Sequence, residues 1–497
     1  MYLTIADACN LSSPAIAPIM FFNVAACSSL TLLVLLQCWS LLFGFCLIPS
    51  YYQPSHQNRA YALFSSTSKD DVHCYGPLSS TFNELSDQLG GSGRAAVLWD
   101  CLRAGIDPNL YYRNDSGIDS SDKAIIESWL EAMSADFDAN DIALSKNDLL
   151  GKRKDQGLGA DALTRLQKLM KQCRSSATCA DDSVTESIYT IENSIGSISH
   201  IKVSADGTTK LLLRLARGYE VESVIIPWLD KGFSTVCVSS QVGCAQACRF
   251  CATGKMGKMS DLTAEEILCQ IYYANKVCRI VSSIAAAGDS STTLPPCDNV
   301  VLMGMGEPAD NALAVVRAVS TMADRRMFSL AQSKITVSTV GPKPSSFTTL
   351  GSSPAALAWS VHAVDDSLRK ELVPTTKFSM EELKEGLVEA LKSRSKKLRR
   401  TMLEVALIDG VNDSEQDAKL LISLAQSIMA DVEGSKVVVN LIPFNDIGHP
   451  KYRTPSEENV LSFQKIITDG GVLCYVRTTR GDEENAACGQ LATSRSK

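Results

Sequence analysis

The segment TVCVSSQVGCAQACRFCATGKMG (235–257) joins an apolar strand pattern at 235–239 to a loop that carries three cysteines. Beyond it, short apolar stretches alternate with amphipathic helical patterns. The further predicted strands are 299–303, 334–339, 358–362, 402–407, 437–442 and 472–477. Strands that alternate with helices form a parallel sheet covered by helices, so we predict an α/β fold with a partial, TIM-like (β/α)6 barrel. Functional residues of such a fold gather at the carboxyl ends of its strands.

The core predicted from this pattern spans residues 231–491, and two smaller regions precede it. Residues 80–195 carry apolar side chains at helical spacing, which predicts a small helical accessory domain. Residues 196–230 alternate apolar and polar side chains around an Asp-Gly pair, which predicts a β-hairpin linker. Within the core, the small and polar residues of 282–296 predict a disordered insertion.

Residues 1–75 have the composition of a targeting leader. The apolar segment 29–48 carries no charge and is long enough to cross a bilayer, and a serine-containing, acid-poor stretch follows it. This two-part pattern resembles the leaders of plastid proteins in algae with complex plastids. We therefore expect a plastid protein after leader cleavage. A mitochondrial or cytoplasmic location, or a membrane anchor through 29–48, is the alternative.

The cysteines are concentrated in one place. The chain of 497 residues has 17 cysteines, and Cys237, Cys244, Cys248 and Cys251 lie within one short segment. A disulfide scaffold would distribute its cysteines through a short chain, so clustering in a long chain favours metal binding or catalysis. The formal net charge of −7 means that any contact with nucleic acid depends on a local basic face.

Cys244, Cys248 and Cys251 form a CxxxCxxC motif directly after the first core strand. Three thiolates on one loop can bind three corners of a 4Fe–4S cluster and leave the fourth iron open for chemistry. The alternative is a zinc site, which normally needs four ligands in two CxxC-like pairs. The sequence shows no second pair beside this one, which favours the cluster.

The segment CVSSQVGCAQACRFCATGKMG (237–257) resembles the radical S-adenosylmethionine (SAM) adenine methyltransferases that act on 23S ribosomal RNA, some of which also act on tRNA. The resemblance continues at VLMGMGEP (301–308), ITVSTVG (335–341), WSVHA (359–363), VNLIPFN (439–445) and VRTTRGDEENAACGQL (476–491). Val242, Pro308 and the Arg-Gly-Asp at 480–482 favour the members that methylate carbon 2 over those that methylate carbon 8. Ser260-Asp261 departs from the family's Arg-Asn pair.

The resemblance implies two cofactors, a 4Fe–4S cluster on Cys244, Cys248 and Cys251 and SAM used twice per turnover. It also implies an electron donor such as a flavodoxin or ferredoxin. The residues that match the family's SAM contacts are Gly306, Glu307, Ser338, Ser360, Val361, His362 and Asn445. Without the resemblance, each could equally be an ordinary polar residue or tight turn at a strand end.

Three further residues carry the family's distinctive chemistry by resemblance. Cys488 accepts a methyl group as a thioether, and that methyl group is then activated to a radical that adds to adenine. Cys237 attacks Cys488 and releases the methylated base as a disulfide forms. Glu222 matches the base that removes the ring proton. On residue chemistry alone, two buried apolar thiols would be the alternative for Cys237 and Cys488.

Basic residues in two places could contact RNA phosphates. The run KSRSKKLRR (392–400) is one, although such a run is usually a solvated helix end. Lys255, Lys258, Arg477 and Arg480 lie beside the cysteine motif or near Cys488 and are better placed. Two other functions stay open at this point: another radical SAM enzyme, such as a carbon-8 methyltransferase or peptide modifier, and a non-catalytic zinc- or RNA-binding protein.

Overall fold

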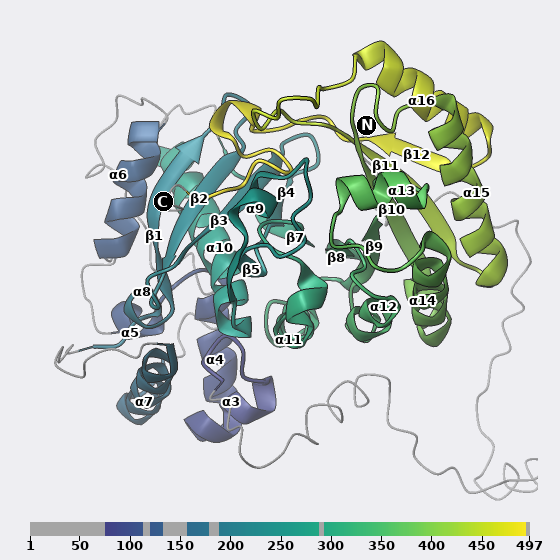
Figure 1. The fold of residues 1–497 in the computed structure, drawn as a ribbon. Coiled ribbons are helices and arrows are strands. Elements are labelled where there is room, and N and C mark those ends of the chain that lie inside the picture. Colours follow the sequence, from purple (N-terminus) through teal and green to yellow (C-terminus); the bar gives the residue numbers. More distant parts are fainter. Residues whose placement is uncertain (1–74, 113–119, 133–156, 178–187, 288–292, 494–497) are drawn as a thin grey trace, which may run out of the picture. The chain divides into compact units, whose positions relative to one another are not determined.

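The computed structural model describes residues 75–112, 120–132, 157–177, 188–287 and 293–493 (Figure 1). The apolar segment 29–48, and all but the last residue of the predicted leader, lie outside these ranges. Among the described residues, no helix has the length and apolar character needed to cross a membrane. Targeting to an organelle therefore stays a prediction.

One ten-stranded sheet organises the described chain, in the order β1-β2-β3-β4-β7-β8-β9-β10-β11-β12. Strands β1 to β4 pair antiparallel, and β4 and β7 to β12 are parallel to their neighbours. All seven predicted core strands overlap strands of this parallel part. The α/β class is confirmed, and the partial barrel stays a prediction. The strands are β1 (Gly196–Val203), β2 (Thr209–Leu215), β3 (Glu220–Trp228), β4 (Phe233–Cys237), β7 (Cys297–Leu302), β8 (Ile335–Thr339), β9 (Ala356–Ser360), β10 (Arg400–Leu407), β11 (Lys436–Pro443) and β12 (Leu473–Val476).

The parallel strands are apolar along most of their length because helices cover them. All five residues of β8 are buried, as expected for a strand enclosed on both faces. Helices follow the strands in sequence, and two of them begin with a capping box in which Ser379 or Ser414 binds the first turn. These helices are α10 (Ala264–Ala287), α11 (Ala312–Ala323), α12 (Pro344–Gly351), α13 (Asp366–Leu372), α14 (Met380–Ser393), α15 (Glu415–Asp431) and α16 (Glu457–Asp469).

Six helices precede the sheet in the described part of the chain, and two of them, α4 and α6, contact its first crossover helix, α10. Asp122 of α6 accepts an ion pair from the buried Lys276 of α10 at 2.8 Å, and Arg279 joins it at 3.3 Å. The predicted boundaries of the accessory domain, linker and core stay predictions. The sheet continues from β3 to β4 across the predicted boundary at 230/231. The six helices are α3 (Phe82–Leu89), α4 (Ser92–Arg103), α5 (Pro108–Tyr111), α6 (Ser120–Ala132), α7 (Ala160–Ala177) and α8 (Ile191–Ser194).

The predicted insertion at 282–296 is wrong in its first part. Helix α10 continues through Ala287, because the sequence SSIAAA ends in alanine, the strongest helix former. Residues 288–292 lie outside the described part of the chain, and residues 293–296 lead directly into β7.

Candidate active site

The three motif cysteines lie on a loop that turns back on itself after β4. Strand β5 (Gln241–Gly243) pairs with β6 (Lys258–Asp261), and α9 (Ala252–Met256) begins directly after Cys251. Two glycines allow the close approach of these elements. A Cβ on Gly243 would lie 1.8 Å from the Gly257 carbonyl oxygen, and one on Gly254 would lie 2.8 Å from the Cys248 carbonyl oxygen. The loop therefore needs glycine at both positions.

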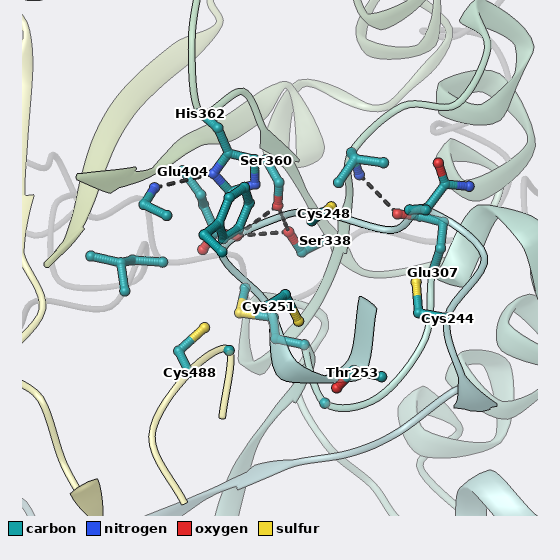
Figure 2. Close-up of a pocket in the computed structure, with 18 of the residues that line it drawn as sticks. Cys244, Cys248, Cys251, Thr253, Glu307, Ser338, Ser360, His362, Glu404 and Cys488 are labelled. Carbon is teal, nitrogen blue, oxygen red and sulfur yellow. Dashed lines mark hydrogen bonds between the residues drawn. The ribbon is translucent and has the colours of Figure 1, made fainter. Parts of the chain in front are cut away.

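Cys244, Cys248 and Cys251 line one cavity at the carboxyl ends of the parallel strands (Figure 2). The cavity has about 950 Å³ of empty space, part of which is open to solvent. Burial raises the pKa of Cys244 to about 12 and that of Cys248 well above its usual value. The three thiols form no disulfide, so they are available as ligands.

This arrangement fits a 4Fe–4S cluster. Among the described residues, no three histidine, cysteine or acidic side chains converge on one point as a single metal ion requires. In a cubane cluster each thiolate instead binds a different iron, so three separate thiols around one cavity suit the cluster better than zinc. A bound cluster would also stabilise the thiolates, which burial alone disfavours.

Glu307 lies on the wall of the same cavity, fully enclosed after β7. Its carboxylate accepts hydrogen bonds from Thr339 Oγ1 at 2.5 Å, the Val340 amide at 2.9 Å and the Ala309 amide at 2.8 Å. Burial nevertheless raises the pKa of Glu307 to about 7. A Cβ on Gly306, which has a φ of 100°, would lie 2.6 Å from the Gln241 side chain, so only glycine fits before Glu307.

The strand ends beyond Glu307 place Ser338, Ser360 and His362 on the cavity wall (Figure 2). The Ser338 and Ser360 hydroxyls lie 2.9 Å apart. His362 has a φ of 58° and accepts a hydrogen bond from the Ala406 amide at Nδ1. Burial, aided by the positive charge of Arg369, lowers the pKa of His362 to about 3, so the ring is neutral. Val361 is buried and does not line the cavity.

Cys488 lies on the same cavity wall, on the loop after β12, and its side chain is exposed there. The loop is fastened to the cysteine loop by the Ala252 amide, which donates to the Gly489 carbonyl at 2.7 Å, and by Thr253 Oγ1, which donates to the Leu491 carbonyl at 2.5 Å. Asn445 Nδ2 donates to the Cys488 carbonyl at 2.8 Å. The contacts of Asn445 in this structure thus position Cys488.

Cys237 ends β4 and is partly buried. Burial raises its pKa to about 12, and the Cys488 thiol adds to this rise. Cys237 does not line the cavity itself. The fold thus brings two thiols that are 251 positions apart in sequence into one neighbourhood.

Comparison with known proteins identifies the family. The chain is 38% identical to the dual-specificity RNA methyltransferase RlmN of Psychrobacter arcticus over 307 residues, which is 59% of this chain and 72% of that protein. The RlmN protein of Lawsonia intracellularis is 38% identical over 308 residues, 61% of this chain and 81% of the relative. The chain belongs to the RlmN family. Members of this family are radical SAM RNA methyltransferases, as the resemblance predicted.

A solved structure agrees with this assignment. The crystal structure of a radical SAM methyltransferase from Sphaerobacter thermophilus matches with a TM-score of 0.51 and 35% sequence identity, covering 61% of this chain and 82% of that one. No family model matches the chain. The RlmN-family assignment implies a 4Fe–4S cluster and SAM as cofactors.

Glu222 does not line either of the two cavities that adjoin Cys488. Its carboxylate on β3 accepts a hydrogen bond from the Ala492 amide at 2.8 Å and pairs with Lys210 at 3.4 Å. Burial raises the pKa of Glu222, and Lys210 opposes the rise. The contact with Ala492 links Glu222 to the chain just beyond the Cys488 loop.

Cys488 also lines a second, smaller cavity. Its wall includes Trp228, Arg477 and Arg480, with the Arg480 guanidinium 4.7 Å from the Trp228 ring centroid. The structure thus places two of the four predicted phosphate contacts beside Cys488. Lys255 is exposed on α9, and Lys258 pairs with Asp261 at 2.8 Å.

The basic run 392–400 lies at the opposite, amino-terminal end of β10. Its arginines are partly used inside the protein. Arg394 is buried and donates to the carbonyls of Ser353 and Ala355, and Arg399 donates to three backbone carbonyls. The exposed lysines Lys396 and Lys397 lie in the short helix η7 (Lys396–Leu398).

Glu404 is a cavity residue that sequence analysis missed. This buried carboxylate of β10 accepts a 2.6 Å hydrogen bond from Ser338 Oγ and lies 3.5 Å from Ser360 Oγ (Figure 2). The available signal was one acidic residue within the apolar run TMLEVALI (401–408). A buried carboxylate needs hydrogen-bond donors. Here they are Ser360 and Ser338, which lie 44 and 66 positions earlier in the sequence on two other strands.

Proposed function

We propose that this chain methylates carbon 2 of an adenine in large-subunit ribosomal RNA, with tRNA as a second substrate class, and that Cys488 carries the methyl group. The observation that supports this most directly is the position of Cys488. Its exposed side chain lines the cavity of Cys244, Cys248 and Cys251 and also the second cavity. A carrier must face both its methyl source and its acceptor, and Cys488 borders both spaces.

In this proposal Cys244, Cys248 and Cys251 hold the 4Fe–4S cluster. Glu307, Ser338, Ser360 and His362 bind SAM along the strand ends, with Gly306 allowing the close approach and Val361 supporting the turn behind it. When bound, cluster and SAM supply the methyl group and a carbon radical, consuming two SAM molecules per turnover and an electron from a flavodoxin- or ferredoxin-like donor. Radical chemistry suits the target, because a ring carbon between two nitrogens is a poor nucleophile.

The neutral residues of the cavity wall have a clear task. Burial raises the pKa of Glu307 to about 7. When the ammonium group of SAM binds beside it, the positive charge favours the ionised carboxylate, and the two groups form an ion pair. His362 stays neutral and contacts Phe250 at 4.4 Å between ring centroids, which gives an apolar wall behind the motif cysteines. This apolar wall of His362 and Phe250 helps to exclude water from the cavity in which the radical is generated.

Cys237 releases the product. Cys237 gives up its proton, and its thiolate sulfur attacks the sulfur of Cys488 to form a disulfide bond. The bond between the Cys488 sulfur and the methylene carbon on the adenine breaks, and that carbon keeps the electron pair and takes up a proton to become the methyl group. Both thiols end in the oxidised state, so the donor must reduce them before another cycle. The raised pKa keeps Cys237 a thiol in the resting protein, which limits premature oxidation. Glu222, with its raised pKa, is proposed as the base for the ring proton.

A Cys237→Ala variant tests the release step. Under anaerobic turnover conditions it should accumulate a covalent protein–RNA adduct that survives denaturing electrophoresis and thiol treatment. Cys474→Ala, which removes a buried thiol of β12, is the matched control and should accumulate none. A radical SAM peptide modifier would need neither Cys237 nor Cys488. Absence of the adduct while the wild-type protein turns over would contradict the proposal.

A further inference from the structure

Basic side chains gather on two loops beside the cavity mouth. Arg249 lies between two motif cysteines and Lys255 lies in α9, while Lys451 and Arg453 lie on the loop after β11. All four are exposed. Lys255 Nζ donates to the Ile447 carbonyl at 3.3 Å, which joins the two loops. We call these four residues and His449 the basic rim.

The four cations of the basic rim all act on His449. The pKa of His449 is lowered by desolvation and then by Lys255, Arg249, Arg453 and Lys451 together. One acidic side chain, Glu371, pairs with Arg249 at 3.9 Å, with both side chains about half exposed. On a chain with a net charge of −7, this is a concentrated positive surface.

The shape of the rim is fixed before any ligand binds. The rings of His449 and Tyr452 stack at 3.9 Å between centroids with an interplanar angle of 17°, and Tyr452 packs on the cavity residue Phe444. Arg453 donates to backbone carbonyls of its own loop, including that of His449 at 3.0 Å. The hydroxyl of Tyr452 is buried without a hydrogen-bond partner among the described residues, so its O–H group can still donate a hydrogen bond.

We propose that the basic rim binds RNA backbone phosphates next to the target nucleotide. This inference rests on the proposed function, since it needs a substrate whose base reaches Cys488. Arg477 and Arg480 line the second cavity together with Cys488 and belong to a different segment from the rim. A nucleotide with its base at Cys488 has one phosphate on each side, and the rim and this arginine pair provide cations for both. An acidic electron-transfer protein would need positive charge only on the cluster side, so RNA accounts for more of the arrangement.

The test compares two double variants that remove equal charge. Lys255→Gln/Lys451→Gln neutralises two rim residues, and Lys396→Gln/Lys397→Gln neutralises two exposed lysines at the opposite ends of the strands. Fluorescence anisotropy would measure binding of a large-subunit rRNA stem-loop transcript and an unmodified tRNA transcript from 50 to 200 mM KCl. The urea midpoint of unfolding and the iron content of each protein serve as folding controls, and both should be equal in all proteins.

We expect the rim variant to bind RNA about tenfold more weakly and to lower the slope of log K against log salt by roughly 1 for each lost phosphate contact. The control variant should bind like the wild type. Equal binding by all three proteins, or equal loss in both variants, would overturn the rim proposal. So would unchanged RNA binding combined with slower cluster reduction by an acidic ferredoxin, since the rim would then dock the donor.

Measurements on the same proteins show whether the rim proposal fails alone or together with the proposed RNA methylation. If the wild type methylates adenine and the rim variant binds RNA equally well, only the rim proposal fails. If the wild type methylates Cys488 but neither binds nor methylates RNA, the proposed RNA substrate fails and the rim proposal with it.

Discussion

Asn445 offers a sharp test of how the Cys488 loop is positioned. Its Nδ2 donates to the Cys488 carbonyl at 2.8 Å, and its Oδ1 accepts from Thr479 Oγ1 at 2.9 Å; Asn445 itself is buried, and both hydrogen bonds are partly buried. Asn445→Asp keeps the shape and the acceptor for Thr479. It loses the donor and places a carboxylate oxygen against the Cys488 carbonyl.

The size of the effect follows from the lost contact. A fully buried carbonyl that loses its donor costs about 1–3 kcal/mol. The Cys488 carbonyl is partly buried, so a cost of about 1.4 kcal/mol, a factor of ten, is expected. We therefore expect Asn445→Asp to slow methylation of Cys488 about tenfold and to leave the KM for SAM within about twofold. Thr479→Val, which removes only the other contact of Asn445, should slow it less.

The assay is the initial rate of labelled methyl transfer from SAM to the tryptic peptide 481–495, measured over a range of SAM concentrations. The family resemblance gave Asn445 a different role, direct contact with SAM. A large rise in KM with an unchanged kcat would support that role and refute positioning through Cys488.

Two further predictions concern buried carboxylates of the cavity. Glu307 has its pKa raised to about 7, so the cofactor-free folded state binds more protons than the unfolded chain between pH 4.5 and 7. The free energy of unfolding should therefore fall by about 3 kcal/mol as the pH rises through this window. In urea titrations, Glu307→Gln should abolish this fall. A pH dependence of the variant equal to that of the wild type would refute the prediction. Glu404→Ala removes the carboxylate that accepts from Ser338 and leaves the Ser338 and Ser360 hydroxyls to pair with each other, so it should cost about 1–3 kcal/mol, whereas Glu404→Gln should cost less; equal urea midpoints for both variants and the wild type would contradict this network.

The sequence predicted the sheet well because each strand carries its own signal. In β11, for example, residues 437–442 are apolar except for Asn440, and this pattern indicates a buried strand; all six residues are buried in the structure. The start of the insertion at 282 was wrong because short polar residues suggested a loop where the following alanines extend the helix. The local sequence pattern therefore predicted the presence of the strands and helices correctly, but it did not predict where this helix ends.

The candidate site was predictable where one motif carries it, as with Cys244, Cys248 and Cys251. It was not predictable where partners come from distant strands. The hydrogen-bonding neighbours of the buried Glu404 are Ser338 and Ser360 on two other strands. The Cys488 loop is held by Asn445, which lies 43 positions earlier in the sequence. The run 392–400 shows the opposite case, because its charge pattern gives no sign that Arg394 is buried on backbone carbonyls. Such relations depend on the fold and not on local sequence.

The most direct test of the account is the mass of one peptide. Residues 76–497 would be expressed anaerobically with iron and sulfide, incubated with SAM, and digested with trypsin. The account predicts that the peptide 481–495 gains one methyl group on Cys488, and that Cys488→Ala abolishes the gain. An unmodified Cys488 in a protein with an intact 4Fe–4S cluster would contradict the proposal that this cysteine carries the methyl group.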